Sequence, residues 1–135
     1  MSQIVPYINF PGNTRAAMDF YAECLGGQVT YMTAPGSAVE EYLADRPDSI
    51  VHSELIAGGL RLMASDMVKP EEIKAGNNVS IMVDCDGEEE IRRFYEKLSA
   101  GGVADHPVQP AFWGGLFGHL VDKFGIAWLL NCSPK

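Results

Sequence analysis

One short segment holds the residues best suited to chemistry. In HSELIAGGLRLMASD (52–66), the Gly-Gly pair at 58 and 59 predicts a two-residue β-hairpin turn. The hairpin pairs Glu54 with Met63 and Leu55 with Leu62. Because side chains alternate along a strand, one face is polar and the other apolar. The polar face carries His52, Glu54, Arg61, Met63 and Ser65, and the apolar face carries Leu55, Leu60, Leu62 and Ala64.

His52 and Glu54 are the candidate catalytic residues of the polar face. They stand two positions apart and therefore point to the same side of the strand. A carboxylate in a semi-apolar cleft can serve as a general base, and a neighbouring imidazole can orient or share its proton. The pair could instead hold two corners of a metal site with His119 as a third ligand, or form a hydrogen-bonded pair on a wetted sheet face. The sequence is compatible with all three roles.

The elements that must position this hairpin follow from a repeat within the chain. MDFYAECLGG (18–27) and IRRFYEKLSAGG (91–102) share Phe-Tyr, a leucine and Gly-Gly, and each predicts an amphipathic helix that stops at glycine. The predicted strands lie at 4–10, 28–33, 50–57 and 60–65 in the first half and at 78–84, 102–108, 112–121 and 126–131 in the second. The sequence thus predicts an α+β fold in a single domain of two βαβββ modules, about 1–67 and 77–135, with a polar linker at 68–76.

Composition narrows the class of protein. A length of 135 residues and a hydrophobic content of 47% are enough for one domain with a real core. The cysteines show no metal-binding spacing and are expected to be reduced thiols: Cys24, Cys85 and Cys132. The sequence shows no secretory leader pattern and no apolar run of membrane-spanning length, which predicts a cytoplasmic protein that does not bind membranes. The formal net charge of −8 disfavours nucleic acid as a partner and favours a neutral or weakly cationic ligand.

The paired modules, the Phe-Tyr helix and the Asp-x-x-Gly turn in FWGGLFGHLVDKFGIAWLLNC (112–132) resemble the vicinal oxygen chelate superfamily. This superfamily includes glyoxalase I, extradiol dioxygenases and bleomycin resistance proteins. Within it, the chain is most similar to the PhnB-like group, whose members often carry names borrowed from glyoxalase or from demethylubiquinone methyltransferase. The resemblance implies two mixed sheets that curve around a small-molecule cleft. It also implies a homodimer, in which edge strands would be covered.

The resemblance further implies where a divalent metal would bind. The superfamily's His and Glu ligands correspond here to Pro6, Met63, Asn78 and Leu129. None of these side chains is a good ligand for a transition ion. We therefore expect a small-molecule-binding protein that lacks the usual metal ligands and needs no cofactor. The alternatives are a glyoxalase-like lyase or isomerase, or a related enzyme, that uses His52 and Glu54 with or without a divalent metal, and a purely structural dimerisation module.

Several further residues are expected to line the cleft. Alternation in 78–84 turns Val79 toward the second helix and Asn78 and Ser80 away from it. Trp113 lies in a glycine-flanked segment, where it can stack on a planar ligand or pack into the core. The full set of predicted ligand-binding residues is Met63, Ser65, Asn78, Ser80, Trp113, His119 and Leu129.

The sequence makes further predictions about the first strand, the last turn, His106 and the segment before the first helix. The first strand admits two orientations, with either Pro6 and Ile8 or Tyr7 and Asn9 facing the cleft. A four-residue turn before the last strand would set His119 beside Trp128 and Leu120 beside Ala127. His106 is expected in an exposed loop. The segment INFPGNT has one glycine, so the chain lacks the glycine-rich turn of a nucleotide-binding methyltransferase.

Overall fold

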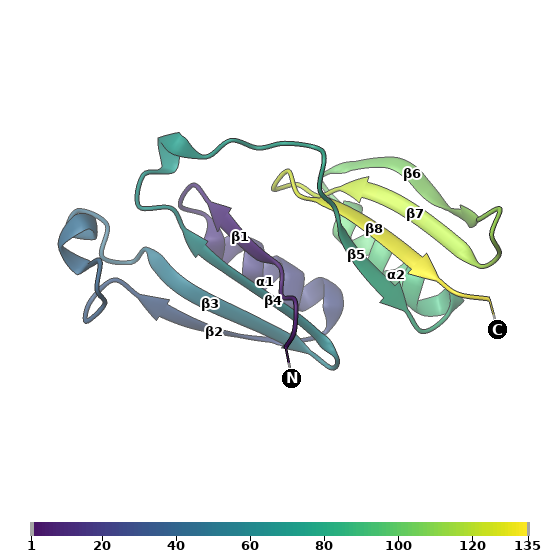
Figure 1. The fold of residues 1–135 in the computed structure, drawn as a ribbon, viewed down its shortest axis with the longest axis horizontal. Helices are drawn as coiled ribbons and strands as arrows, with labels where there is room; N and C mark the ends of the chain where they lie inside the picture. Colours follow the sequence, from purple (N-terminus) through teal and green to yellow (C-terminus); the bar gives the residue numbers. More distant parts are fainter. Residues whose placement is uncertain (1, 135) are drawn as a thin grey trace. The chain divides into compact units, whose positions relative to one another are not determined.

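The chain forms two βαβββ modules, as a computed structural model that describes residues 2–134 shows (Figure 1). They divide between Lys74 and Ala75, within the predicted linker 68–76. The N-terminal module contains β1 (Tyr7–Phe10), α1 (Thr14–Leu25), β2 (Gln28–Thr33), β3 (Ile50–Ala57) and β4 (Leu60–Asp66), with short 3-10 helices η1 (Glu40–Leu43) and η2 (Pro70–Glu72). The C-terminal module contains β5 (Ile81–Cys85), α2 (Glu88–Ser99), β6 (Val103–Pro110), β7 (Leu116–Val121) and β8 (Ala127–Cys132). The predicted α+β fold is confirmed.

The N-terminal sheet has the strand order β1-β4-β3-β2, and β1 runs parallel to β4. Its central hairpin has the register that the Gly58-Gly59 turn predicts, with Glu54 opposite Met63 and Leu55 opposite Leu62. Leu55 and Leu62 are buried on the face that α1 covers (Figure 1). The polar side chains of the hairpin therefore lie on the face of this sheet that bears no helix.

A buried carboxylate holds the start of α1 in place. Asp66, at the end of β4, accepts a hydrogen bond from the Thr14 backbone N–H at 3.0 Å and another from the Ile50 backbone N–H at 2.8 Å. The first N–H groups of a helix lack partners within the helix, and the helix dipole favours negative charge there. Asp66 thus ties α1 to both β3 and β4.

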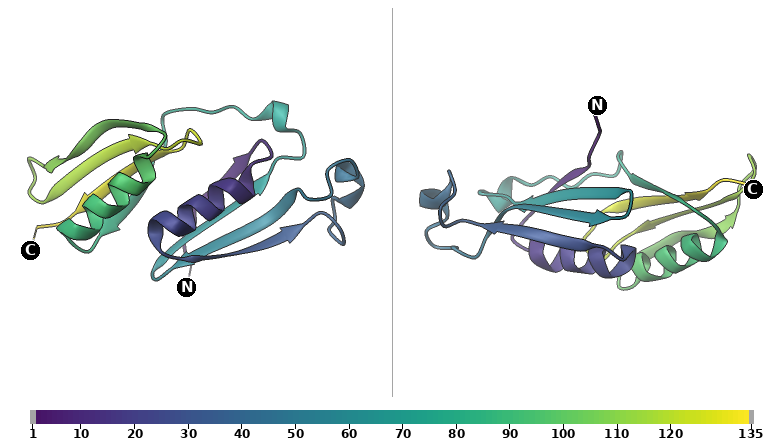
Figure 2. Two further views of the ribbon diagram at one scale, coloured as in Figure 1. Left: turned by 180° about the vertical axis from the view of Figure 1, so that it is seen from behind. Right: turned by 90° about the horizontal axis from the view of Figure 1, so that it is seen from below.

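The C-terminal sheet has the strand order β5-β8-β7-β6, with β5 parallel to β8. The helix α2 lies against one face of this sheet (Figure 2). The buried core comprises Ile91, Phe94 and Leu98 of α2 together with Val83, Leu120, Trp128 and Leu130 of the sheet. Neither helix within residues 2–134 combines the length and apolar character needed to cross a bilayer.

Strands β1, β5 and β7 each begin at least three residues later than predicted. Strand β5 starts at Ile81, which pairs with Trp128 of β8. Val79 is 76% exposed, so the prediction that it packs on the second helix is wrong, and Asn78 and Ser80 precede the strand. Strand β1 starts at Tyr7 rather than at position 4. Strand β7 starts at Leu116 rather than at 112, because the two preceding glycines have φ angles of 93° and 78° that end an extended strand.

The turn of the last hairpin is one residue longer than predicted. Val121 pairs with Ala127, which places His119 opposite Leu129 and Leu120 opposite Trp128, so both predicted pairings are wrong by one position. The buried carboxylate of Asp122 explains the longer turn. Its Oδ1 accepts from the backbone N–H groups of Phe124 (2.8 Å) and Ile126 (3.1 Å), and its Oδ2 accepts from Trp128 Nε1 (2.8 Å).

The side chains of Cys24, Cys85 and Cys132 are buried and carry thiols that are not joined in disulfides. Burial, with a smaller contribution from the nearby charge of Glu90, raises the pKa of the Cys85 thiol to about 12. Since the thiolate is the reactive form and a raised pKa keeps the thiol protonated at pH 8, we expect a disulfide reagent to label Cys85 very slowly in the native protein. Labelling in denaturant should reach three thiols per chain. Rapid labelling of native Cys85, located by peptide mapping, would contradict this prediction.

Candidate functional site

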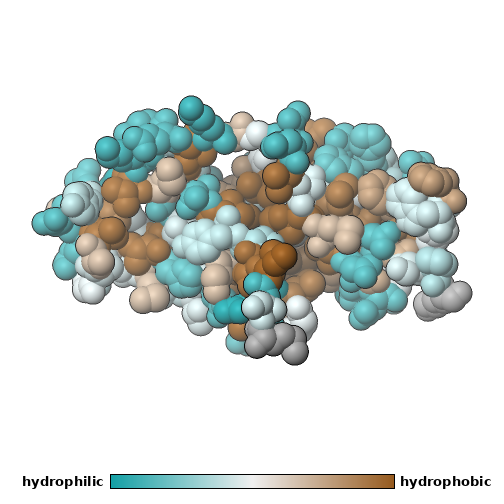
Figure 3. Space-filling view, in the orientation of Figure 1, coloured by the Kyte–Doolittle hydropathy of each residue, from teal (hydrophilic) through white to brown (hydrophobic). Residues whose placement is uncertain are grey.

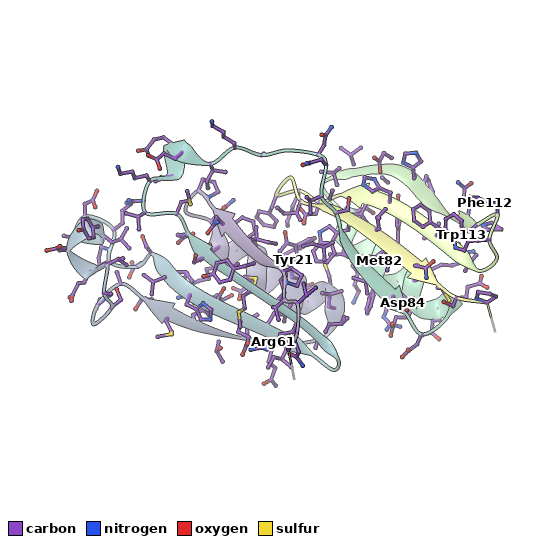
Figure 4. The ribbon with its side chains drawn as sticks, in the orientation of Figure 1. Tyr21, Arg61, Met82, Asp84, Phe112 and Trp113 are labelled. Atoms are coloured by element: carbon purple, nitrogen blue, oxygen red, sulfur yellow. The ribbon has the colours of Figure 1, made fainter. Side chains whose placement is uncertain are left out.

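The bare face of the N-terminal sheet carries two polar pairs. The Tyr7 hydroxyl lies 3.3 Å from His52 Nδ1, and the two rings stack with centroids 5.9 Å apart. Arg61 Nε donates a hydrogen bond to Glu54 Oε2 at 2.6 Å, and Arg61 Nη1 donates to Gln3 Oε1 at 3.2 Å. Figure 4 labels Arg61 on this face. In the structure, the polar face comprises Tyr7, His52, Glu54 and Arg61, and Met63 and Ser65 lie beside them on the same side of the sheet.

The orientation of β1 decides between the two alternatives that the sequence leaves open. Parallel pairing sets Tyr7 beside Met63 and Asn9 beside Ser65, so Tyr7 and Asn9 share the bare face. Phe10, on the other side of the strand, is buried. The structure therefore brings Met63, Ser65, His52 and Glu54 together, as predicted, and adds Tyr7.

Arg61 determines what Glu54 can do. The guanidinium lies in direct contact with one carboxylate oxygen, and both side chains are partly open to solvent. A carboxylate held in this way is arranged as a charged anchor for a donor group on a ligand rather than as a free base. Ion pairs that are open to solvent contribute about 0–1 kcal/mol to stability, so this pair is not needed to hold the hairpin together.

Hydrophilic and hydrophobic residues are mixed on the surface over β3 and β4 (Figure 3).

The bare face of the C-terminal sheet carries both apolar and polar side chains. Met82 and Asp84 of β5 (Figure 4) share it with Leu129 and Asn131 of β8, which are their direct strand partners. Asn131 Nδ2 donates to Asp84 Oδ1 at 3.0 Å. Leu129 thus lies on an open sheet face, as predicted.

A cluster of ionisable side chains spans β6 and β7. His119 Nδ1 lies 2.8 Å from Asp105 Oδ1, and His106 Nδ1 lies 3.7 Å from Asp105 Oδ2. The hydrogen bond with His119 holds the pKa of Asp105 below its ordinary value. His106 belongs to β6 and pairs with His119, so its prediction as a loop residue is wrong. Sequence reasoning missed Asp105, because irregular pairing in β6 hides its position from an alternation pattern.

Trp113 lies in the connection between β6 and β7 and is 53% exposed. Its ring makes edge contacts with Phe112 at 4.7 Å and with Phe117 at 5.4 Å. Figure 4 shows Phe112 and Trp113 together at this end of the module. Of the two predicted roles, packing into the core is therefore wrong, and stacking on a planar ligand stays a prediction.

The four positions that correspond to the superfamily's metal ligands hold side chains that bind transition ions poorly. The Pro6 carbonyl accepts a hydrogen bond from the Met63 backbone N–H at 3.0 Å. The thioether of Met63 and the isobutyl group of Leu129 offer no hard donor, and Asn78 offers a weak amide oxygen. These residues do not fit the ligand set of a divalent transition ion.

Comparison with known proteins places the whole chain in one family. Residues 2–131 match the family model described as 3-demethylubiquinone-9 3-methyltransferase. Protein PA1353 from Pseudomonas aeruginosa has a similar structure with 36% sequence identity and a TM-score of 0.87, over 100% of each chain. The PhnB protein from Bacillus cereus is 22% identical with a TM-score of 0.79, over 98% of this chain and 100% of its own. Protein YjdN from Escherichia coli K12 is 27% identical over 93% of this chain and 92% of its own length.

The fold extends to more distant proteins. A bleomycin-binding protein solved in complex with bleomycin is 18% identical with a TM-score of 0.60, over 98% of this chain and 99% of its own. This likeness, like the one to PhnB, shows a shared fold. The match over residues 2–131 shows that the chain belongs to the family described as 3-demethylubiquinone-9 3-methyltransferase, and the shared fold is the one that the resemblance to the vicinal oxygen chelate superfamily implies.

Proposed function

We propose that this chain is a cytoplasmic small-molecule-binding protein that works without the superfamily's usual metal. The observation that carries the proposal is the polar face, where four side chains from three strands are held in pairs on a sheet face without a helix. A fold of the same class binds bleomycin in the bleomycin-binding protein, which supports a binding role. The net charge of −8 favours a neutral or weakly cationic ligand and disfavours nucleic acid and anionic membranes.

The polar face supplies hydrogen-bonding groups, and Met63 on the same sheet face supplies apolar contact area. Glu54 can accept a hydrogen bond from a donor on the ligand, and His52, aligned by Tyr7, can donate or accept one. Within the C-terminal module by itself, Leu129 would supply apolar contact and Trp113 stacking. The other proposed ligand-binding residues are Ser65, Asn78, Ser80 and His119.

An enzymatic role would use His52 and Glu54 as catalytic residues, with or without a divalent metal. The ion pair with Arg61 favours the binding role over this one, because it occupies the carboxylate that a general base would need. The methyltransferase activity that the family description names does not suit this fold. Its two four-stranded mixed sheets differ from the doubly wound parallel sheet that binds nucleotides.

Ligand binding can be tested on the purified chain. Native mass spectrometry would identify any retained small molecule, and a thermal-shift panel of neutral, cationic and anionic compounds would find others. We expect saturable stabilisation by a neutral or cationic compound, weakened in Glu54→Gln and unchanged in Glu72→Gln, whose carboxylate is exposed. Absence of any saturable ligand would favour the dimerisation module instead. Turnover that Glu54→Gln abolishes would favour the enzyme.

No tightly bound transition metal is expected, because Pro6, Met63, Asn78 and Leu129 replace the usual ligands. Elemental analysis after purification without added metal should give far less than one ion per chain. Stoichiometric Zn, Ni, Mn or Fe would contradict this expectation, and its loss in His52→Ala would assign the ion to His52 and Glu54.

We also propose that the protein is a homodimer. Within their sheets, β2 and β6 are edge strands, and Val103 of β6 exposes more than half of its side chain. Exposed strand edges offer unpaired backbone groups that a second copy can cover. Sedimentation velocity at micromolar concentration should give a species of twice 14.7 kDa. A single species of 14.7 kDa would refute the proposal.

A further inference from the structure

Asp105, His106 and His119 bring three metal-binding groups to one place in the C-terminal module. One ligand atom from each residue lies within 4.8 Å of the other two. Two of the chain's three histidines are in this group, which we call the His-Asp cluster. None of its residues belongs to the polar face or to the four positions that correspond to the superfamily's metal ligands, although His119 is the strand partner of Leu129, which is one of those positions.

We propose that the His-Asp cluster binds a divalent transition ion such as Zn²⁺ through two imidazole nitrogens and one carboxylate oxygen. These donor types suit Zn²⁺, Co²⁺ and Ni²⁺. Metal–ligand bonds of about 2.0–2.1 Å in a tetrahedral site put neighbouring ligand atoms about 3.4 Å apart. The distances from Asp105 oxygens to His119 Nδ1 (2.8 and 2.9 Å) and to His106 Nδ1 (3.7 Å) bracket that value.

The backbone holds these groups in place. Between the pairs Val103–Val121 and His106–His119, two residues of β6 stand opposite one residue of β7, which is a β-bulge. The bulge lets consecutive residues, Asp105 and His106, both approach His119. The Tyr95 hydroxyl donates a hydrogen bond to the His119 carbonyl at 2.8 Å and so fixes the strand at this point. Small side-chain rotations are then enough to converge on an ion.

The structure also indicates how the ion would behave. Three protein ligands leave a fourth position for water or for an oxygen of a small molecule. The side chain of His106 is 65% exposed and that of His119 is 22% exposed, so the site opens to solvent. The ion therefore exchanges readily and is lost during purification without added metal. This agrees with the expected absence of tightly bound metal.

Isothermal titration of the chelator-treated full-length chain with Zn²⁺ tests the proposal. We expect saturable binding of one ion per chain. His106→Ala, Asp105→Asn and His119→Ala should each weaken it at least about tenfold. His106→Ala is the key variant, because its exposed side chain can be removed without disturbing the core, and circular dichroism would verify that each variant is folded. The matched control is His52→Ala, which should leave binding unchanged.

Several results would overturn the proposal. These are the absence of saturable Zn²⁺ binding, unchanged affinity in both His106→Ala and Asp105→Asn, and loss of binding in His52→Ala. Titration with Co²⁺ adds a spectroscopic readout. Visible d–d bands that His106→Ala alters would support the cluster, whereas a thiolate charge-transfer band would assign the ion to a cysteine and refute it.

Discussion

Replacing Asp122 by alanine is expected to lower the free energy of unfolding by about 3–5 kcal/mol. The carboxylate accepts hydrogen bonds from two backbone N–H groups and from the indole of Trp128, which is itself buried. A hydrogen bond to a charged group contributes about 1.5–3 kcal/mol, and a buried donor left unpaired costs about 1–3 kcal/mol. Because the same side chain organises the turn, its loss removes both the turn and the Trp128 partner.

Denaturation in guanidinium chloride measures this effect. Asp122→Asn should cost less than Asp122→Ala, since the amide oxygen retains one acceptor but the amide nitrogen cannot replace the other. The matched control is Asp45→Ala, where the side chain is 80% exposed and its nearest cation is 3.8 Å away. A control of this kind should stay within about 0.5 kcal/mol of the original protein. Equal losses at positions 122 and 45 would contradict the structural role of Asp122.

The second large effect is expected at the N-terminal hairpin. Leu62 is buried under α1, and Leu62→Ala should reduce stability by about 2–5 kcal/mol through lost apolar contact and the cavity left behind. Glu54→Gln, on the opposite face, should change stability by less than about 1 kcal/mol, because it replaces a solvent-accessible ion pair. Urea denaturation curves for the two variants give the comparison.

The two variants test the division of the hairpin into a core face and a binding face. Since successive residues point to opposite faces, a register shift of one would exchange the roles of Leu62 and Glu54. If Glu54→Gln were the more destabilising variant, the polar face could not be the proposed binding surface. Thermal-shift titration of Glu54→Gln with the ligand found for the original chain should show the lost affinity that a purely structural Glu54 would not produce.

Local patterns predicted the hairpin well. The turn at Gly58-Gly59 is two residues long, and one face of its strands is apolar while the other is polar, so a register shifted by one residue would bury charged groups. Strands β2 and β3 have the bounds that the sequence predicts. The two helices could also be predicted from the sequence, because the residues around each Phe-Tyr pair have helical spacing and glycines follow them.

Features that depend on distant contacts could not be predicted in the same way. Both faces of the last hairpin are apolar, so periodicity offered no test of its register, and the extra turn residue follows from how Asp122 bonds Trp128. The side on which Tyr7 lies depends on parallel pairing with β4, more than fifty residues along the chain. The bulge that joins Asp105 to His106 and His119 is likewise a property of two strands together.

The pairing of β1 with β4 has a consequence for synthesis on the ribosome. The first strand to emerge has its partner in the last strand of its module, and Asp66 at the end of that strand also holds the start of α1. The nascent N-terminal half therefore cannot complete its sheet until Asp66 has left the exit tunnel. Once it has, every strand partner in that sheet is available, so this half can fold before the second half is translated. Stalled nascent chains of increasing length should accordingly gain protease resistance in a single step after that residue emerges.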